Sequence, residues 1–495
     1  MFDSSFHLDM CISLTKHSPP IDKLNHLPTI SLIIDYSDRT RIMTLQDEDN
    51  ICVGLKRHDC VCWVNLQAPS SSFHSWLLKM DQPFPRLVDL SLLSTTLETD
   101  EPSLVLPETF QAPNLRRLSL HGIGLPTGLP LLSSAVALST LSLTHIRPSC
   151  YFPPGNLATQ LRALPHLEEL SIGFVILATS EEGLLPPPVS PVTLPSVRRL
   201  TFRGADTYLD SLVAQISAPP LEQLTLTLHF DLTFSLVNLT GFIHRTEGFK
   251  LLIVRVVFNK DGVSIDAGYN EQQDYGKSSF HVNVNCEPVD WQIDSATQIC
   301  SALGNVLSTV EDLTVDLRDF GMPSDWESTL EDVQWQELLL PFIGVKKLHI
   351  GSSLTLGLSQ ALASGGGELV LPELQELDVS LEIDDVTDAL TAFIETRESV
   401  GRHIDLLVPP EDEEEKTRIQ TTLAARRSQR EELEYRWQRK LEVAVKHAVD
   451  AERKELEYRW QRKLENAVYA ERKEKEIWRA RALALEEQLK GLDVS

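Results

Sequence analysis

The stretch APNLRRLSLHGIGL (residues 112–125) carries the pattern on which the fold prediction depends. Leu115, Leu118 and Leu120 form the frame L-x-x-L-x-L, and polar residues separate them. Apolar and polar residues that alternate in this way are typical of a strand with one buried face. One copy has little meaning in a leucine-rich chain, so the prediction depends on repetition.

The same frame recurs along most of the chain. Copies begin at Val61, Leu87, Leu115, Leu138, Leu167, Val197, Leu221, Leu251, Val310, Val345 and Leu374. From Leu87 to Leu251, successive copies start 23 to 30 residues apart, and the wider gap before Val310 leaves room for one degenerate repeat near Phe280. With an earlier strand expected at residues 29–36, the chain holds about eleven or twelve repeats.

Segments with helical spacing separate several of the expected strands. They cover residues 156–164, 208–216, 295–307 and 386–394. A helix that returns the chain to the next parallel strand favours a right-handed connection, and each repeat then buries its apolar face only against its neighbours. We therefore predict an α/β fold for residues 28–408, an irregular right-handed leucine-rich-repeat solenoid with the form of a horseshoe.

The repeats also resemble a known family. Units in which FPRL, APNL or LPHL leads into a polar-spaced strand, together with DYSD, HDCVCWVNL and PFIGVKKLHI, resemble the leucine-rich-repeat body of mushroom-type fungal F-box proteins over residues 28–408. The resemblance implies a substrate receptor of a cullin-type ubiquitin ligase, in which an F-box binds the Skp adaptor and the repeats hold the substrate.

The sequence departs from the pattern of that family in two respects. Residues 1–27 lack the L-P-x-E-[IVL] start and the Cys-x-x-W ending of an F-box, so we expect an N-terminal segment whose F-box is absent or truncated. The Skp adaptor is then expected as a partner only if an F-box lies upstream. The usual Asn or Cys after the third apolar position is replaced by Ile123, Ile146, Val175 and Ala205, which predicts an irregular backbone ladder.

The composition changes after Pro409 and Pro410, and no further Pro or Gly occurs before Gly491. A run rich in Ala, Leu, Glu, Lys and Arg predicts one long helix over residues 411–491, about 115 Å at 1.5 Å per residue. The segment ELEYRWQRKLE occurs in it twice, at residues 432–442 and 455–465.

We expect both copies to place their apolar side chains on one stripe that pairs with another helix as a coiled coil. The expected seam consists of Leu433, Trp437, Leu441, Leu456, Trp460, Leu464, Trp478, Leu485 and Leu489. The partner helix would belong to a second copy of the chain. The alternative is a solvated single helix stabilised by Glu–Arg and Glu–Lys pairs four residues apart.

Charge and composition narrow the class of partner. Residues 411–495 contain 20 acidic and 20 basic side chains, so the net charge of −26 belongs to the part of the chain before them. Such a surface repels phosphate backbones, which argues against nucleic acid. No apolar run reaches the roughly eighteen residues of a membrane span. Asp3, His7 and Asp9 are unlike a signal peptide, and seven scattered cysteines suit a reducing compartment, so we expect the cytoplasm or the nucleus.

No motif in the sequence points to catalysis, so we expect neither enzyme activity nor a cofactor. His58, Asp59, Cys60 and Cys62 lack a second Cys or His pair at zinc spacing, and we expect no metal there. The expected contact surface is the concave sheet, formed by polar positions between the buried ones. These are Arg117, His121, Glu169, Arg199, Arg203, Asp312, Asp316, Lys347 and His349, with Glu376 and Asp378.

The sequence therefore predicts a non-catalytic protein-binding scaffold, derived from an F-box substrate receptor. The alternative is a structural coiled-coil oligomerisation protein that carries a vestigial repeat domain.

Overall fold

The computed structural model describes most of the chain. The described residues are 11–16, 18, 31–37, 43–96, 103–126, 130–175, 191–229, 234, 236–246, 251–269, 279–286, 288–318, 332–364, 370–379, 384–408 and 413–492. Met1–Lys416 and Thr417–Ser495 form two compact units, and each is described by itself. Most of the N-terminal segment 1–27, where an F-box was considered, lies outside the described residues.

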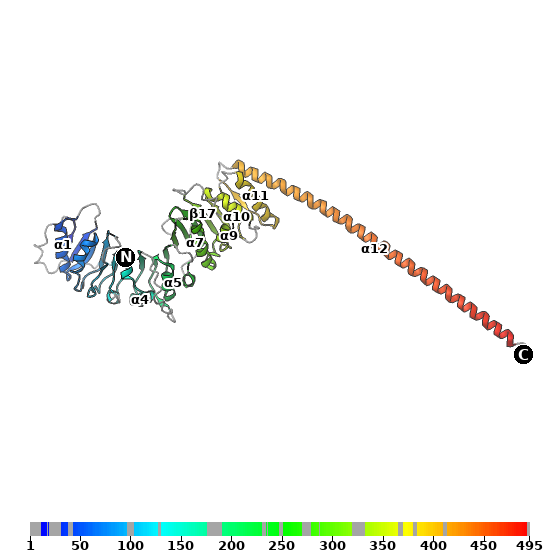
Figure 1. Ribbon diagram of the computed structural model, residues 1–495, viewed down its shortest axis with the longest axis horizontal. Coiled ribbons are helices and arrows are strands. Elements are labelled where there is room, and N and C mark those ends of the chain that lie inside the picture. The colour runs from blue at the N-terminus through cyan, green and yellow to red at the C-terminus, as the bar shows by residue number, and fades with distance from the viewer. Residues whose placement is uncertain are drawn as a thin grey trace. The chain divides into compact units, whose positions relative to one another are not determined.

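The first unit is a mixed α/β structure built on one large sheet (Figure 1). Among the described residues, sixteen strands form this sheet in the order β1-β2-β3-β4-β6-β8-β9-β11-β13-β16-β15-β14-β17-β18-β19-β20. The strands up to β13 follow chain order and pair in parallel, as do those from β17 onward.

The strands have the following bounds: β1 Cys11–Leu14, β2 Ser31–Tyr36, β3 Val61–Ala68, β4 Asp89–Ser94, β6 Arg117–His121, β8 Thr140–Ile146, β9 Glu169–Phe174, β11 Arg199–Gly204, β13 Gln223–His229, β14 Ile253–Asn259, β15 Gly262–Gly268, β16 Phe280–Asn285, β17 Asp312–Leu317, β18 Lys347–Ile350, β19 Glu376–Val379 and β20 Asp405–Leu407. Two short pairs lie outside this sheet: β5 Leu104–Val105 with β7 Ile123–Gly124, and β10 Val192–Thr193 with β12 Ile216–Ser217.

Helices connect many of these strands. Their bounds are α1 Leu45–Lys56, α2 Ser70–Leu77, α3 Pro130–Ser134, α4 Pro154–Leu161, α5 Asp206–Gln215, α6 Val237–His244, α7 Val289–Ala302, α8 Gly304–Leu307, α9 Asp332–Leu339, α10 Thr355–Ser364 and α11 Asp384–Ser399. Neighbouring helices pack side by side, α4 on α5, α5 on α6, and α9 on α10. The four helical segments predicted from spacing are all present, as α4, α5, α7 with α8, and α11.

The leucine frame produces this core directly. In β6, Leu118 and Leu120 are fully buried, whereas Arg117 is exposed and Ser119 and His121 are half-buried. The same alternation holds in β13 and β17. Because registers align the frames, each buried leucine lies beside the equivalent apolar residue of the next strand, as Leu118 lies beside Leu141. The other face of the sheet keeps its polar side chains, and we call it the polar face.

A buried arginine fixes the chain before β19. Arg397 of α11 is 1% exposed, and its guanidinium donates hydrogen bonds to the carbonyl oxygens of Val370, Leu371, Pro372 and Leu374 at 2.9–3.3 Å. Buried carbonyl groups need such donors, so one side chain satisfies the turn that leads into the strand.

The gap between the copies at Leu251 and Val310 differs from the expected single degenerate repeat. The strand near Phe280 exists, as β16, but it pairs with β13 and so precedes β14 in the sheet. β15 lies between β16 and β14 and is antiparallel to both. The physical reason is the tight turn at Lys260 and Asp261, which sends the chain straight back as a hairpin instead of through a helix.

Gly262 begins the returning strand of this hairpin, and we expect its replacement to weaken the middle of the sheet. Its φ is +153°, and an added Cβ would lie 1.9 Å from the carbonyl oxygen of Val284 in β16. Gly262→Ala should lower the free energy of unfolding by about 1–3 kcal/mol, the usual scale of local backbone strain. Urea unfolding of the variant and the parent chain measures it, and a loss below about 0.5 kcal/mol contradicts the expectation.

The second unit consists of a long helix. α12 spans Glu413–Leu492, 80 residues, as the breaker-free composition predicts (Figure 1). Across the part of the chain that the structure describes, no helix is both long and apolar enough to cross a membrane.

Candidate functional site

Hydroxyl side chains line the middle of the polar face. Six strands in succession place a Ser or Thr at the same register position. These residues, here called the hydroxyl stripe, are Ser91, Ser119, Ser142, Ser171, Thr201 and Thr225. Five are half-buried and Thr201 is exposed. Small hydroxyls both donate and accept hydrogen bonds and carry no charge, so the stripe offers an approachable polar surface.

Ion pairs between neighbouring strands flank the stripe on its N-terminal side. Arg117 Nε lies 2.6 Å from Asp89 Oδ2, and its guanidinium lies 5.2 Å from the ring centre of Trp63. Burial raises the pKa of Asp89, and the hydrogen bond from Arg117 opposes that effect. Arg199 and Glu169, both predicted surface residues, are register neighbours and form an ion pair.

Three further pairs cross the polar face between β13 and β19. Arg255 Nη2 contacts Asp316 Oδ2 at 2.6 Å, and His349 Nδ1 lies 3.0 Å from Asp378 Oδ2. His281 Nδ1 lies 2.6 Å from Asp266 Oδ1. Of these residues, the sequence analysis named Asp316, His349 and Asp378. It missed Arg255, although Arg255 stands at a polar position of the frame that begins at Leu251. It missed His281 and Asp266 because only the antiparallel pairing of β15 with β16 brings them together.

The remaining predicted surface residues share one register position. Asp312, Lys347 and Glu376 begin β17, β18 and β19 and lie side by side across these strands. Asp312 and Lys347 are half-buried, and Glu376 is exposed. The structure therefore places all eleven predicted residues on the polar face, and it brings most of them together in cross-strand pairs. Such pairs contribute modestly to stability, about 0.2–1 kcal/mol each, and fix where charges stand.

Three histidines and Arg203 gather at the carboxyl ends of β6, β8, β11 and β13. His121 Nδ1 lies 2.9 Å from Thr144 Oγ1, and the rings of His121 and His145 are 4.0 Å apart. Burial lowers the pKa of His121 to about 4, and His145 adds to the effect. The pKa values of His145 and His229 are also lowered, first by burial and then by Arg203. His145 and His229 were not predicted. His145 lies at a register irregularity in β8 with a φ of +54°, which its sequence does not reveal.

The lowered pKa of His121 should make stability depend on pH. Between the ordinary value of 6.5 and the folded value of about 4, the unfolded chain binds more protons than the folded chain. The contribution of neutral His121 to the free energy of unfolding should therefore be complete above pH 6.5. The free energy of unfolding should decrease as the pH falls from 6.5 toward 4. Facing His121 are His145 and Thr144 from β8, and Arg203 reaches His145.

His121→Gln should make that decrease shallower, because the substituted side chain takes up no proton. Urea unfolding at pH 7 and pH 5 measures the difference, and His74→Gln, at an exposed position of α2, is the control. If the free energy of unfolding of His121→Gln falls between pH 7 and pH 5 by as much as that of the parent chain, His121 does not cause the pH dependence.

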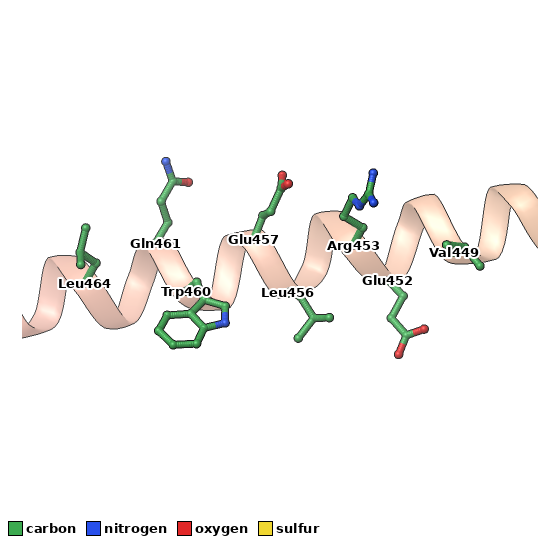
Figure 2. Close-up of a pocket in the computed structure, with 8 residues that line it drawn as sticks. All are labelled: Val449, Glu452, Arg453, Leu456, Glu457, Trp460, Gln461 and Leu464. Atoms are coloured by element: carbon green, nitrogen blue, oxygen red, sulfur yellow. The ribbon is translucent and has the colours of Figure 1, made fainter.

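A second candidate surface lies on α12. Val449, Glu452, Arg453, Leu456, Glu457, Trp460, Gln461 and Leu464 line a shallow groove. Figure 2 shows Leu456 and Trp460 projecting from the same side of the helix, opposite Glu457 and Gln461. Trp437 and Trp460 are each 71% exposed, and Trp478 is 60% exposed. Leu433, Leu441, Leu464 and Leu485 are exposed too, whereas the Leu489 side chain lies outside the described set.

The expectation that both copies of ELEYRWQRKLE share one stripe is wrong. α12 is one continuous α-helix, and at 3.6 residues per turn an offset of 23 residues rotates equivalent side chains by about 140°. Trp437 and Trp460 therefore face different sides. Trp478, 18 residues after Trp460, returns to the side of Trp460 after about five turns. Val445 and Val449 bridge the two sides in steps of four residues.

Local pairs also stabilise α12, as the single-helix alternative expects. Glu432 pairs with Arg436 at 2.7 Å, and Glu455 with Arg459 at 2.6 Å, both four residues apart. Lys440 and Arg481 lie near the rings of Trp437 and Trp478. These contacts cover little of either ring, since both side chains remain largely exposed.

Within the described ranges, no group of three or more His, Cys, Asp or Glu side chains could hold a metal ion. No model of a known protein family matches the sequence, and no curated protein is similar to it.

Proposed function

We propose that this chain is a non-catalytic protein-binding scaffold whose residues 28–408 form a right-handed leucine-rich-repeat solenoid. The observation that carries the proposal is the alignment of eleven L-x-x-L-x-L frames in one sheet, with their apolar positions buried and their polar positions on one face. In a solenoid of this kind the sheet face is the extended binding surface. The resemblance to mushroom-type fungal F-box proteins supports an origin as a substrate receptor of a ubiquitin ligase.

The composition of the polar face favours a protein partner over nucleic acid. Arg117, Arg199 and Arg255 are paired with carboxylates, so Arg203 alone among these four arginines keeps an unpaired charge, too little for an extended phosphate backbone. The hydroxyl stripe and the cross-strand pairs instead match the polar, hydrogen-bonding character of many protein interfaces.

Self-association through α12 is the second part of the proposal. Three tryptophans and several leucines lie exposed along one helix, more apolar surface than an isolated helix ordinarily shows to water. A second copy of the chain offers the same surface, and coiled-coil pairing would cover it. Because the copies of ELEYRWQRKLE face different sides, more than one partner helix is needed to cover both.

Affinity capture from the native host separates the receptor from a purely structural oligomer. The full chain should recover a distinct protein, and Ser142→Arg with Thr201→Arg on the hydroxyl stripe should reduce that recovery at least tenfold. Thr159→Arg, at an exposed position of α4, is the control. Recovery of the Skp adaptor supports a ligase receptor, whereas recovery of only the chain's own copies supports an oligomerisation protein with a vestigial repeat domain.

A further inference from the structure

Four basic side chains meet where neighbouring strands of the polar face end. His121 is the last residue of β6, and His229 is the last residue of β13. His145 lies one residue before the end of β8, and Arg203 one residue before the end of β11. Strands that run in parallel bring these ends to the same edge of the sheet, so residues up to 108 positions apart in the sequence converge.

β9 lies between β8 and β11 and brings their side chains close. Gly173 stands beside Arg203 in the register. A Cβ added at Gly173 would lie 3.5 Å from Arg203 Cβ and 3.7 Å from Thr144 Cα. Because Gly173 has no side chain, Arg203 and the end of β8 can approach each other across this strand, and Arg203 is near enough to lower the pKa of His145.

Arg203 differs from the other arginines of the polar face. Arg117, Arg199 and Arg255 each contact a carboxylate on a neighbouring strand. In the described part of the chain Arg203 forms no ion pair, and its side chain is exposed. The guanidinium of Arg203 therefore stands on the polar face with no neighbouring carboxylate to neutralise its charge in the described part of the chain.

His229 adds an unsatisfied ring nitrogen to this group, which becomes a hydrogen-bond donor when the ring is protonated. The backbone of Phe174 hydrogen-bonds one side of the ring, whereas Nε2 is buried without a hydrogen-bond partner. A buried polar atom of this kind costs free energy until a partner arrives.

We propose that Arg203, His121, His145 and His229 bind an oxyanion presented by a protein partner, either a phosphoryl group or a carboxylate. Both groups share the chemistry that the site needs, negative oxygen atoms that accept several charge-assisted hydrogen bonds. The proposal rests on the proposed function for the source of the anion. The binding of the anion itself is independent of it.

Anion binding must couple to proton uptake by the histidines. The groups that face one another are His121 from β6, His145 from β8, Arg203 from β11 and His229 from β13. Glu169, at the other end of β9, is paired with Arg199. Without an anion, the positive charge of one group disfavours protonation of its neighbours. A bound negative charge instead favours protonation of the histidines. Affinity for the anion should rise as pH falls from 8 toward 6.

Histidine NMR on the full-length chain tests the site, with inorganic sulfate as the probe because its charge stays constant between pH 4 and pH 8. Sulfate should raise the pKa of His145 and His229 by on the order of one unit. Sodium chloride at equal ionic strength should not. Single His→Gln variants assign the signals.

Arg203→Gln should abolish the sulfate effect, and it should also raise both pKa values in the absence of sulfate. Arg199→Gln, on the same strand and face, is the matched control and should retain the effect. A sulfate effect of equal size in Arg203→Gln, or one that chloride reproduces, overturns the proposal.

Acetate distinguishes the two sources of the anion. A response to acetate equal to that of sulfate supports a carboxylate of the partner, and a response to sulfate alone supports a phosphoryl group. If the sulfate effect persists but no protein partner contacts the polar face, the anion site stands and the proposed function fails.

Discussion

Removal of residues 428–495 should convert a self-associating chain into a monomer. This truncation deletes both copies of ELEYRWQRKLE and keeps the buried Ile419. Covering an exposed tryptophan of about 150 Å² at roughly 25 cal/mol per Å² contributes about 4 kcal/mol before the costs of association. The chain has three such tryptophans on α12, so association at micromolar concentration is expected. Sedimentation equilibrium of the full-length and truncated chains measures it.

Point variants test whether self-association depends on the tryptophans of the expected seam or only on the presence of α12. Trp437→Ala with Trp460→Ala removes one ring from each copy and should weaken association at least tenfold. Val443→Ala with Lys454→Ala is the control. Both side chains are exposed, and each lies about 100–120° around α12 from the sides of Trp437 and Trp460. Equal monomer masses for the full-length and truncated chains would leave α12 as a solvated single helix.

Leu118→Ala should strongly destabilise the α/β unit. Leu118 is fully buried in β6, between β4 and β8, and its loss removes apolar contacts and leaves a cavity. We expect the free energy of unfolding to fall by about 2–5 kcal/mol. Because β6 pairs with β4 on one side and with β8 on the other, the loss should spread to both of these strands. Urea unfolding, followed by far-ultraviolet circular dichroism, measures it.

Ser119→Ala is the control for that substitution. Ser119 is the next residue of the same strand, but it lies half-buried in the hydroxyl stripe, and its loss should change stability by no more than about 0.5 kcal/mol. Equal effects at Leu118 and Ser119 would contradict the assignment of one buried and one polar face to β6.

The sequence predicted much of the sheet because the leucine frame acts locally. Every copy of the frame, from Val61 to Leu374, leads into a strand, and the second apolar residue is buried in each. The hairpin of β14 and β15 escaped prediction because both strands alternate like repeat strands, and sequence alternation does not encode direction. β16 was recognised as a strand but assigned to the wrong place for the same reason.

The candidate site was predictable only in part. Polar positions of the frame correctly indicated the residues of the polar face, such as Arg117 and Glu169. Their partners depend on register, which the sequence leaves open where strands carry irregularities such as the one at His145. On α12, the two copies of ELEYRWQRKLE have the same sequence, which led to the expectation of a single stripe. Their offset of 23 residues rotates equivalent side chains by about 140°, so the copies face different sides of the helix.

Site-specific photocrosslinking in the native host tests the central claim, that the polar face binds a protein partner. A photoreactive residue at Ser142, Ser171 or Thr201 would stand on the hydroxyl stripe, and one at Thr159 would stand on α4. We predict that the three stripe positions crosslink to the same protein and that Thr159 does not. Crosslinks from Thr159 alone, or none from the stripe while copies of the chain crosslink through α12, would contradict the account.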